Sequence, residues 1–276
     1  MPIAPLPDRA VVAIAGEEAA GFLQGLVTCN VETLPPGEAR PGALLTPQGK
    51  ILFDFLIARA GDGFHLDVAR ALVPDLIRRL TLYRLRAKVT LAETPLTVSA
   101  AWDAAPGEGW LRDGRLPALG WRLHAPEAPA ADADEGAYHA HRIGLGVPES
   151  GADFTLGDAF PHEALMDELG GVDFRKGCYV GQEVVSRMQH RGTARTRVVM
   201  LRYPGGAAAP AGTPVTAGGK ALGTTGSAAG DRGLALLRLD RLADALAAGE
   251  GAEAGGLPVS VEKPGFARFA MPAEAG

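Results

Sequence analysis

The most chemically varied stretch of the sequence lies at residues 174–192, FRKGCYVGQEVVSRMQHRG. It gathers a thiol, an aromatic ring, an amide, a carboxylate and several cations into one short segment. The run that follows Cys178 has a helix-compatible composition, so this cysteine should lie just before a helix N-terminus. The positive end of a helix, together with Arg175 and Lys176, favours the thiolate over the thiol. These features predict a reactive thiol at Cys178, with a buried, inert cysteine as the alternative.

The same stretch has side chains suited to a pterin ring. A carboxylate such as Glu183 can pair at two points with the amino and ring N–H groups of an aminopyrimidinone, Tyr179 could stack on the ring, and distant arginines could hold a glutamate tail. Gly177 and Gly181 can adopt backbone angles closed to other residues, which brings main-chain N–H groups close to a ligand. Glu183 could equally be a first-turn acid that stabilises the helix dipole, and the spacing leaves both interpretations open.

Basic residues concentrate in two segments of a chain whose net charge is -5. Residues 76–92 hold five arginines and lysines without an acidic neighbour, and residues 175–202 hold seven with only Glu183 against them. This pattern predicts a local anion site, although a solvated helix face and a strand edge would give it too. The negative net charge provides no long-range attraction for nucleic acid, so an RNA-binding module is the least favoured function.

Composition is that of a globular protein, with 47% hydrophobic and 21% charged residues. Cys29 and Cys178 are too few for a disulfide scaffold or a self-contained zinc or cluster site, and the six histidines form no convincing metal set. No stretch approaches the roughly 18 uncharged apolar residues of a membrane helix. We therefore expect a cytoplasmic protein without membrane contact or a resident metal, in which Cys29 is buried; a Cys29–Cys178 disulfide is the alternative.

Strand and helix patterns alternate without the long regularity of a doubly wound sheet, which predicts α+β units. Apolar positions at helical spacing predict helices over residues 17–26 and 71–83, and strands are expected at 11–14, 51–58, 64–68, 88–91 and 96–100. Residues 125–136 are polar and rich in Ala and Pro, which is typical of a linker. Short strands punctuated by Gly and Pro after residue 196 predict a small β-barrel domain.

Residues 176–183, KGCYVGQE, resemble the signature K-G-C-[YF]-x-G-Q-E of the YgfZ folate-binding family at every defined position. Supporting similarities occur at GFLQGLVT (21–28), GKILFD (49–54), YRLRAKV (83–89) and RIGLGVP (142–148). The resemblance implies an aminomethyltransferase-like fold with two mixed α/β (ferredoxin-like) domains and a small C-terminal β-barrel. The expected division is residues 1–38 with 125–195 as the folate-binding domain, 39–124 as the second domain, and 196–276 as the barrel.

The resemblance also implies tetrahydrofolate, or a one-carbon derivative of it, as the cofactor. Iron-sulfur enzymes, or the proteins that assemble their clusters, would be the partners, including enzymes that modify transfer RNA but without direct contact to the nucleic acid. Cys178 would carry the thiol chemistry. The folate would be held by a set of residues drawn from the matched motifs: Asp54, Arg142, Lys176, Gly177, Tyr179, Gly181, Gln182 and Glu183.

The sequence departs from the related aminomethyltransferases, which carry a pair of acids where this chain reads Leu52-Phe53-Asp54. Their Gly-Tyr-Thr-Gly-Glu stretch corresponds here to residues 115–122, RLPALGWR, without the clamping acid, and they have no thiol in place of Cys178. One-carbon transfer needs a positioned acid or base and an oriented folate. A folate-binding accessory protein is therefore favoured, with a folate-dependent aminomethyltransferase that uses Asp54 as the alternative; Asp54 could also be a turn or cap residue.

Overall fold

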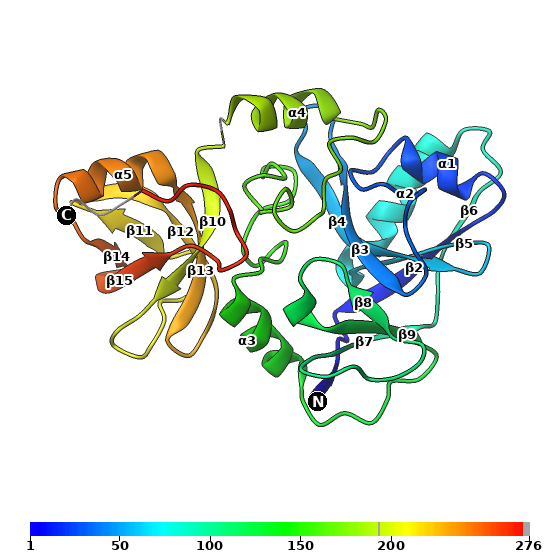
Figure 1. Ribbon diagram of the computed structural model, residues 1–276, viewed down its shortest axis with the longest axis horizontal. Helices are drawn as coiled ribbons and strands as arrows, with labels where there is room; N and C mark the ends of the chain where they lie inside the picture. The colour runs from blue at the N-terminus through cyan, green and yellow to red at the C-terminus, as the bar shows by residue number, and fades with distance from the viewer. Residues whose placement is uncertain (193, 273–276) are drawn as a thin grey trace. The chain divides into compact units, whose positions relative to one another are not determined.

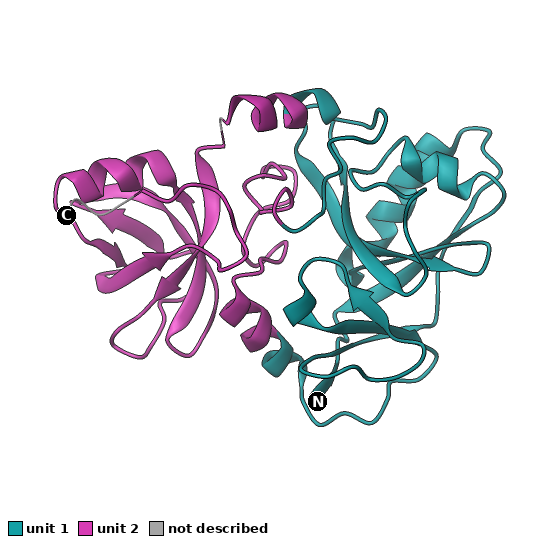
Figure 2. Cartoon of the chain, in the orientation of Figure 1, with its two compact units in different colours: residues 1–138, 169–184 teal, residues 139–168, 185–276 magenta. Residues whose placement is uncertain are grey.

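The computed structural model describes residues 1–192 and 194–272, which form two compact units (Figure 2). Unit 1 comprises Met1–Tyr138 and Leu169–Val184, and unit 2 comprises His139–Glu168 and Val185–Gly276. None of the helices in the described residues is long and apolar enough to cross a membrane.

Unit 1 is built on one nine-stranded mixed sheet, in the order β1-β7-β9-β8-β3-β4-β5-β2-β6 (Figure 1). Neighbouring strands are antiparallel except β3 and β8, which run parallel. Strands from the first and second predicted domains thus hydrogen-bond within one sheet. The division of the chain into three domains stays a prediction. The strands are β1 (Ile3–Pro5), β2 (Arg9–Ala15), β3 (Glu38–Leu45), β4 (Ile51–Ala60), β5 (Gly63–Ala69), β6 (Thr90–Glu93), β7 (Thr97–Ala101), β8 (Leu111–Asp113) and β9 (Trp121–Ala125).

Two helices cover one face of this sheet because each presents an apolar side to it. Helix α1 (Ala19–Gln24) buries Leu23, and α2 (Val73–Arg84), which follows the 3-10 turn η1 (Arg70–Leu72), buries Leu76 and Leu80. These side chains join residues of β2, β4 and β5 in a single core cluster. Burial of a leucine contributes roughly 1.5–3 kcal/mol, so this layer provides much of the stability of unit 1.

The sheet curls, so that strands distant in its order come together. Arg122 on β9 places its Nε 3.5 Å from Asp113 Oδ2 on β8 and 3.8 Å from Asp67 Oδ2 on β5. Asp67 also accepts a hydrogen bond of 2.7 Å from Arg9 Nε. Burial would raise the pKa of Asp67, but the charges of Arg9 and Arg122 outweigh it and lower the pKa. Buried ion pairs therefore join the two limbs of the sheet.

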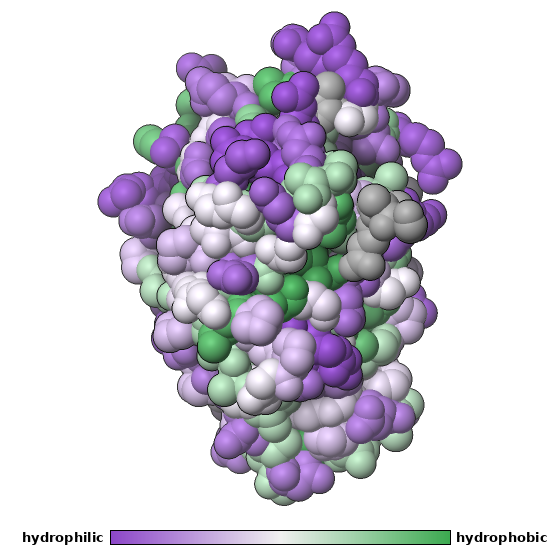
Figure 3. Space-filling view, turned by 90° about the vertical axis from the view of Figure 1, so that its left-hand side faces the viewer, coloured by the Kyte–Doolittle hydropathy of each residue, from purple (hydrophilic) through white to green (hydrophobic). Residues whose placement is uncertain are grey.

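Unit 2 contains a closed barrel of six strands in the order β10-β13-β12-β11-β14-β15. They are β10 (Thr196–Arg202), β11 (Pro214–Ala217), β12 (Lys220–Ala229), β13 (Arg232–Arg238), β14 (Ala252–Ala254) and β15 (Leu257–Glu262), with helix α5 (Leu239–Ala247) packed on the outside. Alternate strand residues point inward and form one apolar core. The face in Figure 3 carries hydrophilic residues around its rim and apolar ones near its middle.

The predicted α+β class and C-terminal barrel are confirmed, and the predicted helices and strands lie within a few residues of the observed ones. Residues 126–134 have no regular structure and join β9 to helix α3 (Glu135–Leu145), as the linker composition indicated. Strand β3 was missed because Pro41 and Gly42 interrupt its pattern. A Cβ on Gly42 would lie 2.6 Å from Cys29 Sγ, so a side chain is excluded there by packing.

Candidate functional site

The KGCYVGQE segment runs as an irregular chain into helix α4 (Gln182–Arg191). Its first anchor is Lys176, whose side chain points inward and is only 7% exposed. The Nζ atom donates hydrogen bonds of 2.6 Å to the Val27 carbonyl and 2.8 Å to the Cys29 carbonyl, in the loop after α1. Burial lowers the pKa of Lys176, partly offset by neighbouring acidic groups. Two carbonyls far away in the sequence therefore fix the start of the segment.

The turn that leads into Lys176 is formed by Asp173. Its Oδ1 accepts hydrogen bonds from the backbone N–H groups of Arg175 (2.8 Å) and Lys176 (3.1 Å). Desolvation would raise the pKa of Asp173, but these N–H groups and the side chain of Asn30 outweigh it and lower the pKa. The sequence signal that could have identified this residue is an Asp two positions before the cations, since Asp side chains commonly bond the backbone two residues on.

The second anchor is Tyr179, which is also 7% exposed. The ring centre lies 5.3 Å from Lys176 Nζ, so the ring and the ammonium form a buried cation–π contact. Burial, followed by the charge of Asp173, raises the pKa of Tyr179 to about 12. The ring therefore packs beneath the segment, and its expected stacking on a pterin stays a prediction.

The third anchor is Gly181, which approaches the turn between β3 and β4 too closely for any side chain. Its φ is +81°, and a Cβ would lie 2.5 Å from the Thr46 carbonyl oxygen and 3.1 Å from Gly49 Cα. Gly177, by contrast, has no atom within 4 Å of a Cβ position. The two glycines predicted to act alike thus differ: Gly181 is required for packing, and Gly177 lies in the open.

Cys178 is exposed, in a two-residue tip with Gly177 between the Lys176 and Tyr179 anchors. Three residues separate it from Gln182, the first residue of α4, which agrees with its predicted place before a helix N-terminus. Cys29 is buried as expected, and burial raises the pKa of its thiol to about 11. Both thiols are free, so the alternative of a disulfide between them is wrong.

The predicted carboxylates lie near the same β-hairpin. Asp54 is on β4, paired with Ala43 of β3, and is half-buried. Gln182 and the exposed Glu183 begin α4, directly after Gly181 has packed on the turn of that hairpin. The fold therefore brings the start of α4 to the hairpin that carries Asp54, from more than a hundred residues away in the sequence.

Arg142 lies in unit 2, on α3, and is 2% exposed. Its Nη1 lies 2.8 Å from Asp153 Oδ2 and its Nε lies 3.1 Å from Glu149 Oε2. Asp153 in turn accepts hydrogen bonds from the backbone N–H and the hydroxyl of Ser227 on β12. Two carboxylates thus engage this guanidinium and tie α3 to the barrel, and a contact from Arg142 to folate stays a prediction.

A cavity of about 530 Å³ adjoins the turn before Lys176. It is polar, and it lies between the loop after α1 and the chain that leads into the signature segment. Its lining residues are Asn30, Thr33, Arg40, Gly170, Val172, Asp173, Phe174 and Arg175. Of these, the sequence had singled out only Arg175.

Comparison with known proteins gives both sequence and fold relatives. Residues 195–269 match the family described as CAF17, C-terminal beta-barrel domain. The chain is 34% identical to the mitochondrial iron-sulfur cluster assembly factor IBA57 of Homo sapiens over 289 residues, covering 90% of this chain and 81% of the relative. It is also 34% identical to the IBA57 homolog of Pyricularia oryzae, covering 90% and 75%, and 32% identical to that of Mus musculus, covering 86% and 77%.

Among solved structures, the aminomethyltransferase T of the glycine cleavage system from Bartonella henselae matches with a TM-score of 0.76. The match covers 96% of this chain and 86% of the other at 17% identity, so it establishes the aminomethyltransferase-like fold and no more. The sequence relatives also overturn one expectation. All three are named as mitochondrial proteins, so the prediction of a cytoplasmic protein is wrong.

Proposed function

Because the chain belongs to the family of the iron-sulfur cluster assembly factors IBA57, we propose that it acts in iron-sulfur cluster assembly by presenting the thiol of Cys178. The observation that carries the proposal is the exposed Gly177-Cys178 tip between buried anchors on both sides. The YgfZ family, which the octapeptide resembles, is a related family, and membership of it stays a prediction.

The anchors account for a thiol that is both accessible and fixed in place. Ordering one backbone residue costs about 1–2 kcal/mol, so a short exposed tip stays ordered only if its neighbours are held. The ammonium of Lys176 bonds two carbonyls on one side, and Gly181 packs on the β3–β4 turn on the other. Packing does not require a cysteine at this exposed position. Binding of a metal ion by a thiolate does require one.

The thiolate is a ligand suited to iron in clusters, and a cluster normally takes about four such ligands. The chain has two cysteines, and Cys29 is buried with its pKa raised to about 11. Cys178 would therefore contribute one ligand, and an iron-sulfur protein or an assembly protein would supply the others. The cluster is then the cargo of the reaction, shared transiently between two proteins.

Complementation of a strain that lacks the gene tests this role. We expect Cys178→Ala to abolish the activity of iron-sulfur enzymes, including those that thiolate transfer RNA, while Cys29→Ala in the same assay retains it. Far-UV circular dichroism would establish that both variants are folded. Full complementation by Cys178→Ala would refute the thiol role. If Cys178→Ala lost the activity of other iron-sulfur enzymes but kept transfer-RNA thiolation, only the proposed support of transfer-RNA-modifying enzymes would be refuted.

We also propose that unit 1 binds tetrahydrofolate beside the β3–β4 hairpin. The fit rests on the carboxylates of Asp54 and the exposed Glu183, which could accept hydrogen bonds from a pterin, and on the amide of Gln182, which could both donate and accept them. When bound, the folate would supply or accept a one-carbon group. Lys176, Tyr179 and Gly181 support the chain beneath these residues, as the contacts above describe, and Gly177 leaves the tip open.

Titration with tetrahydrofolate, followed by protein fluorescence, tests the folate proposal. Glu183→Ala should weaken binding by about tenfold, the value of one charge-assisted hydrogen bond, and Cys178→Ala should leave it nearly unchanged. Equal affinity in the wild type and Glu183→Ala would refute the assigned site. Formation of methylenetetrahydrofolate from an aminomethyl donor, lost in Asp54→Asn, would instead favour a one-carbon transferase.

A further inference from the structure

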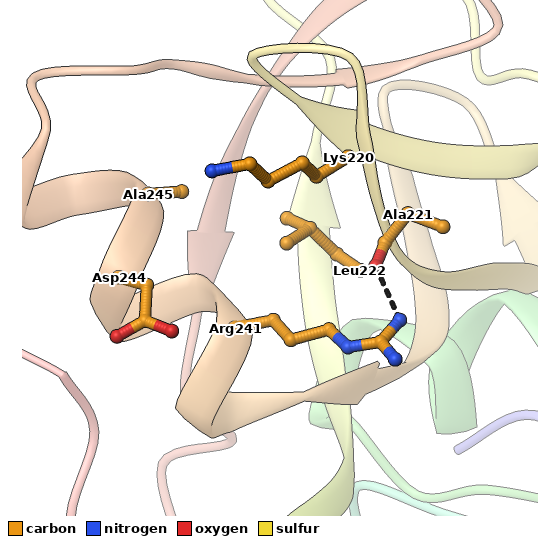
Figure 4. Close-up of a pocket in the computed structure, with 6 residues that line it drawn as sticks. All are labelled: Lys220, Ala221, Leu222, Arg241, Asp244 and Ala245. Carbon is orange, nitrogen blue, oxygen red and sulfur yellow. Dashed lines mark hydrogen bonds between the residues drawn. The ribbon is translucent and has the colours of Figure 1, made fainter.

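A second hollow lies on the barrel of unit 2, between strand β12 and helix α5. It has a volume of about 340 Å³, within the range of roughly 300–1,000 Å³ that is typical of small-ligand pockets. Its lining comes from two elements only: Lys220, Ala221 and Leu222 from β12, and Arg241, Asp244 and Ala245 from α5 (Figure 4). None of these residues belongs to the site described above.

The hollow has an apolar floor with cations on two sides of it. Leu222 is 1% exposed and Ala245 is buried, while Lys220 and Arg241 reach across the hollow from opposite elements (Figure 4). Arg241, Asp244 and Ala245 are three and four residues apart on α5, so they share one face of the helix. The arrangement suits a molecule with a short apolar part and an anionic group.

The guanidinium of Arg241 is held in place before any ligand arrives. Its Nη1 donates a hydrogen bond of 2.8 Å to the carbonyl oxygen of Ala221, which leaves its other N–H groups for a second acceptor. Nearby, Arg238 is instead neutralised by Asp240 at 2.6 Å. Among the ion pairs of the described residues Arg241 has no carboxylate partner, although Asp244 lines the same hollow, so its guanidinium can pair with the carboxylate of a ligand.

The charges that line the hollow do not neutralise one another. Two cations face one carboxylate, and among residues 1–192 and 194–272 neither Lys220 nor Asp244 forms an ion pair. Two like charges that share a hollow repel each other, and an anion placed between them attracts both and so offsets this repulsion. A cation in the same place would increase it.

We propose that this hollow binds a small carboxylate-bearing molecule. The carboxylate lies between the ammonium of Lys220 and the guanidinium of Arg241, and a short apolar group covers Leu222 and Ala245. Asp244 at the edge disfavours ligands with further negative charge. The class of ligand is therefore a monocarboxylate on a short aliphatic group, and binding here is independent of the thiol of Cys178.

The test is a titration of the full-length protein with isobutyrate, followed by amide chemical shifts in two-dimensional NMR. For a ligand of this size we expect saturable shifts with a Kd on the order of 1 mM, confined to the amides around β12 and α5. Lys220→Gln and Arg241→Gln should each weaken binding by about fivefold or more, because each removes a charge-assisted hydrogen bond. Lys263→Gln, on the same barrel unit but outside the hollow, is the matched control and should bind as the wild type does.

The alternative probes separate the chemistry of the ligand. Butylamine, which has an apolar chain and the opposite charge, should not shift these amides, and inorganic phosphate should bind more weakly than isobutyrate because it lacks the apolar part. The proposal is overturned if isobutyrate causes no saturable shift, if both Gln variants bind as tightly as the wild type, or if phosphate or butylamine binds equally well. All the substituted side chains are exposed, and unchanged thermal unfolding of each variant would show that it is folded.

Discussion

Replacement of Gly181 by Ala should destabilise unit 1 through the contact between the signature segment and the β3–β4 turn. At φ +81° an L-residue costs about 1–2 kcal/mol relative to glycine. The added Cβ would also lie 2.5 Å from the Thr46 carbonyl oxygen, a backbone atom, so the turn or the segment must move. Overpacking of this kind costs typically about 1–3 kcal/mol, which gives a total of about 3 kcal/mol.

The control is Gly177→Ala, four residues earlier in the same segment. No atom lies within 4 Å of its Cβ position, and its φ is not in the left-handed region, so we expect a change of less than about 0.5 kcal/mol. Both variants would be unfolded in urea and followed by tryptophan fluorescence. All three tryptophans belong to unit 1, so the signal reports on the unit that contains both glycines: Trp102, Trp110 and Trp121.

A difference of about 3 kcal/mol between the two variants would support the close packing of Gly181. Equal unfolding midpoints for Gly181→Ala and Gly177→Ala would refute it, because the two substitutions add the same methyl group and differ only in backbone angle and surroundings. A matching slope of the urea dependence would show that both variants unfold with the same exposed surface.

Other predictions concern titration, thiol access and a buried ion pair. Burial lowers the pKa of His124 from 6.5 to about 4, so the unfolded state binds the proton more tightly than the folded state. The contribution of the neutral His124 to the free energy of unfolding should be fully present above pH 6.5 and fall by about 3 kcal/mol towards pH 4. His124→Leu should reduce this pH dependence in urea unfolding. Iodoacetamide at neutral pH should label Cys178 alone in the native protein, and labelling of Cys29 at a similar rate would contradict its burial. Asp167→Asn should lower the free energy of unfolding by about 3 kcal/mol, because the buried guanidinium of Arg197 loses the carboxylate that lies 2.7 Å from it. A change in this free energy below about 0.5 kcal/mol, measured by calorimetry, would contradict the value assigned to the pair.

Local patterns in the sequence were enough to predict those helices and strands whose apolar residues recur at regular spacing. The helical spacing of Leu76 and Leu80 predicted α2, and Gly and Pro punctuation predicted the strands of the barrel. The same holds for the 174–192 segment, where residue types predicted that Cys178 lies just before a helix, and the structure has it ahead of α4. These features depend on neighbours within a few residues, which a sequence displays directly.

Tertiary packing decided where the charged and aromatic side chains of that segment point. Lys176 was expected beside the thiol, but its ammonium binds carbonyls 147 and 149 residues away in the chain, and Tyr179 covers it. The sequence specifies the residue types that can make such contacts. Only the folded chain selects the partners, because a buried polar group must find its hydrogen bonds wherever the fold places them.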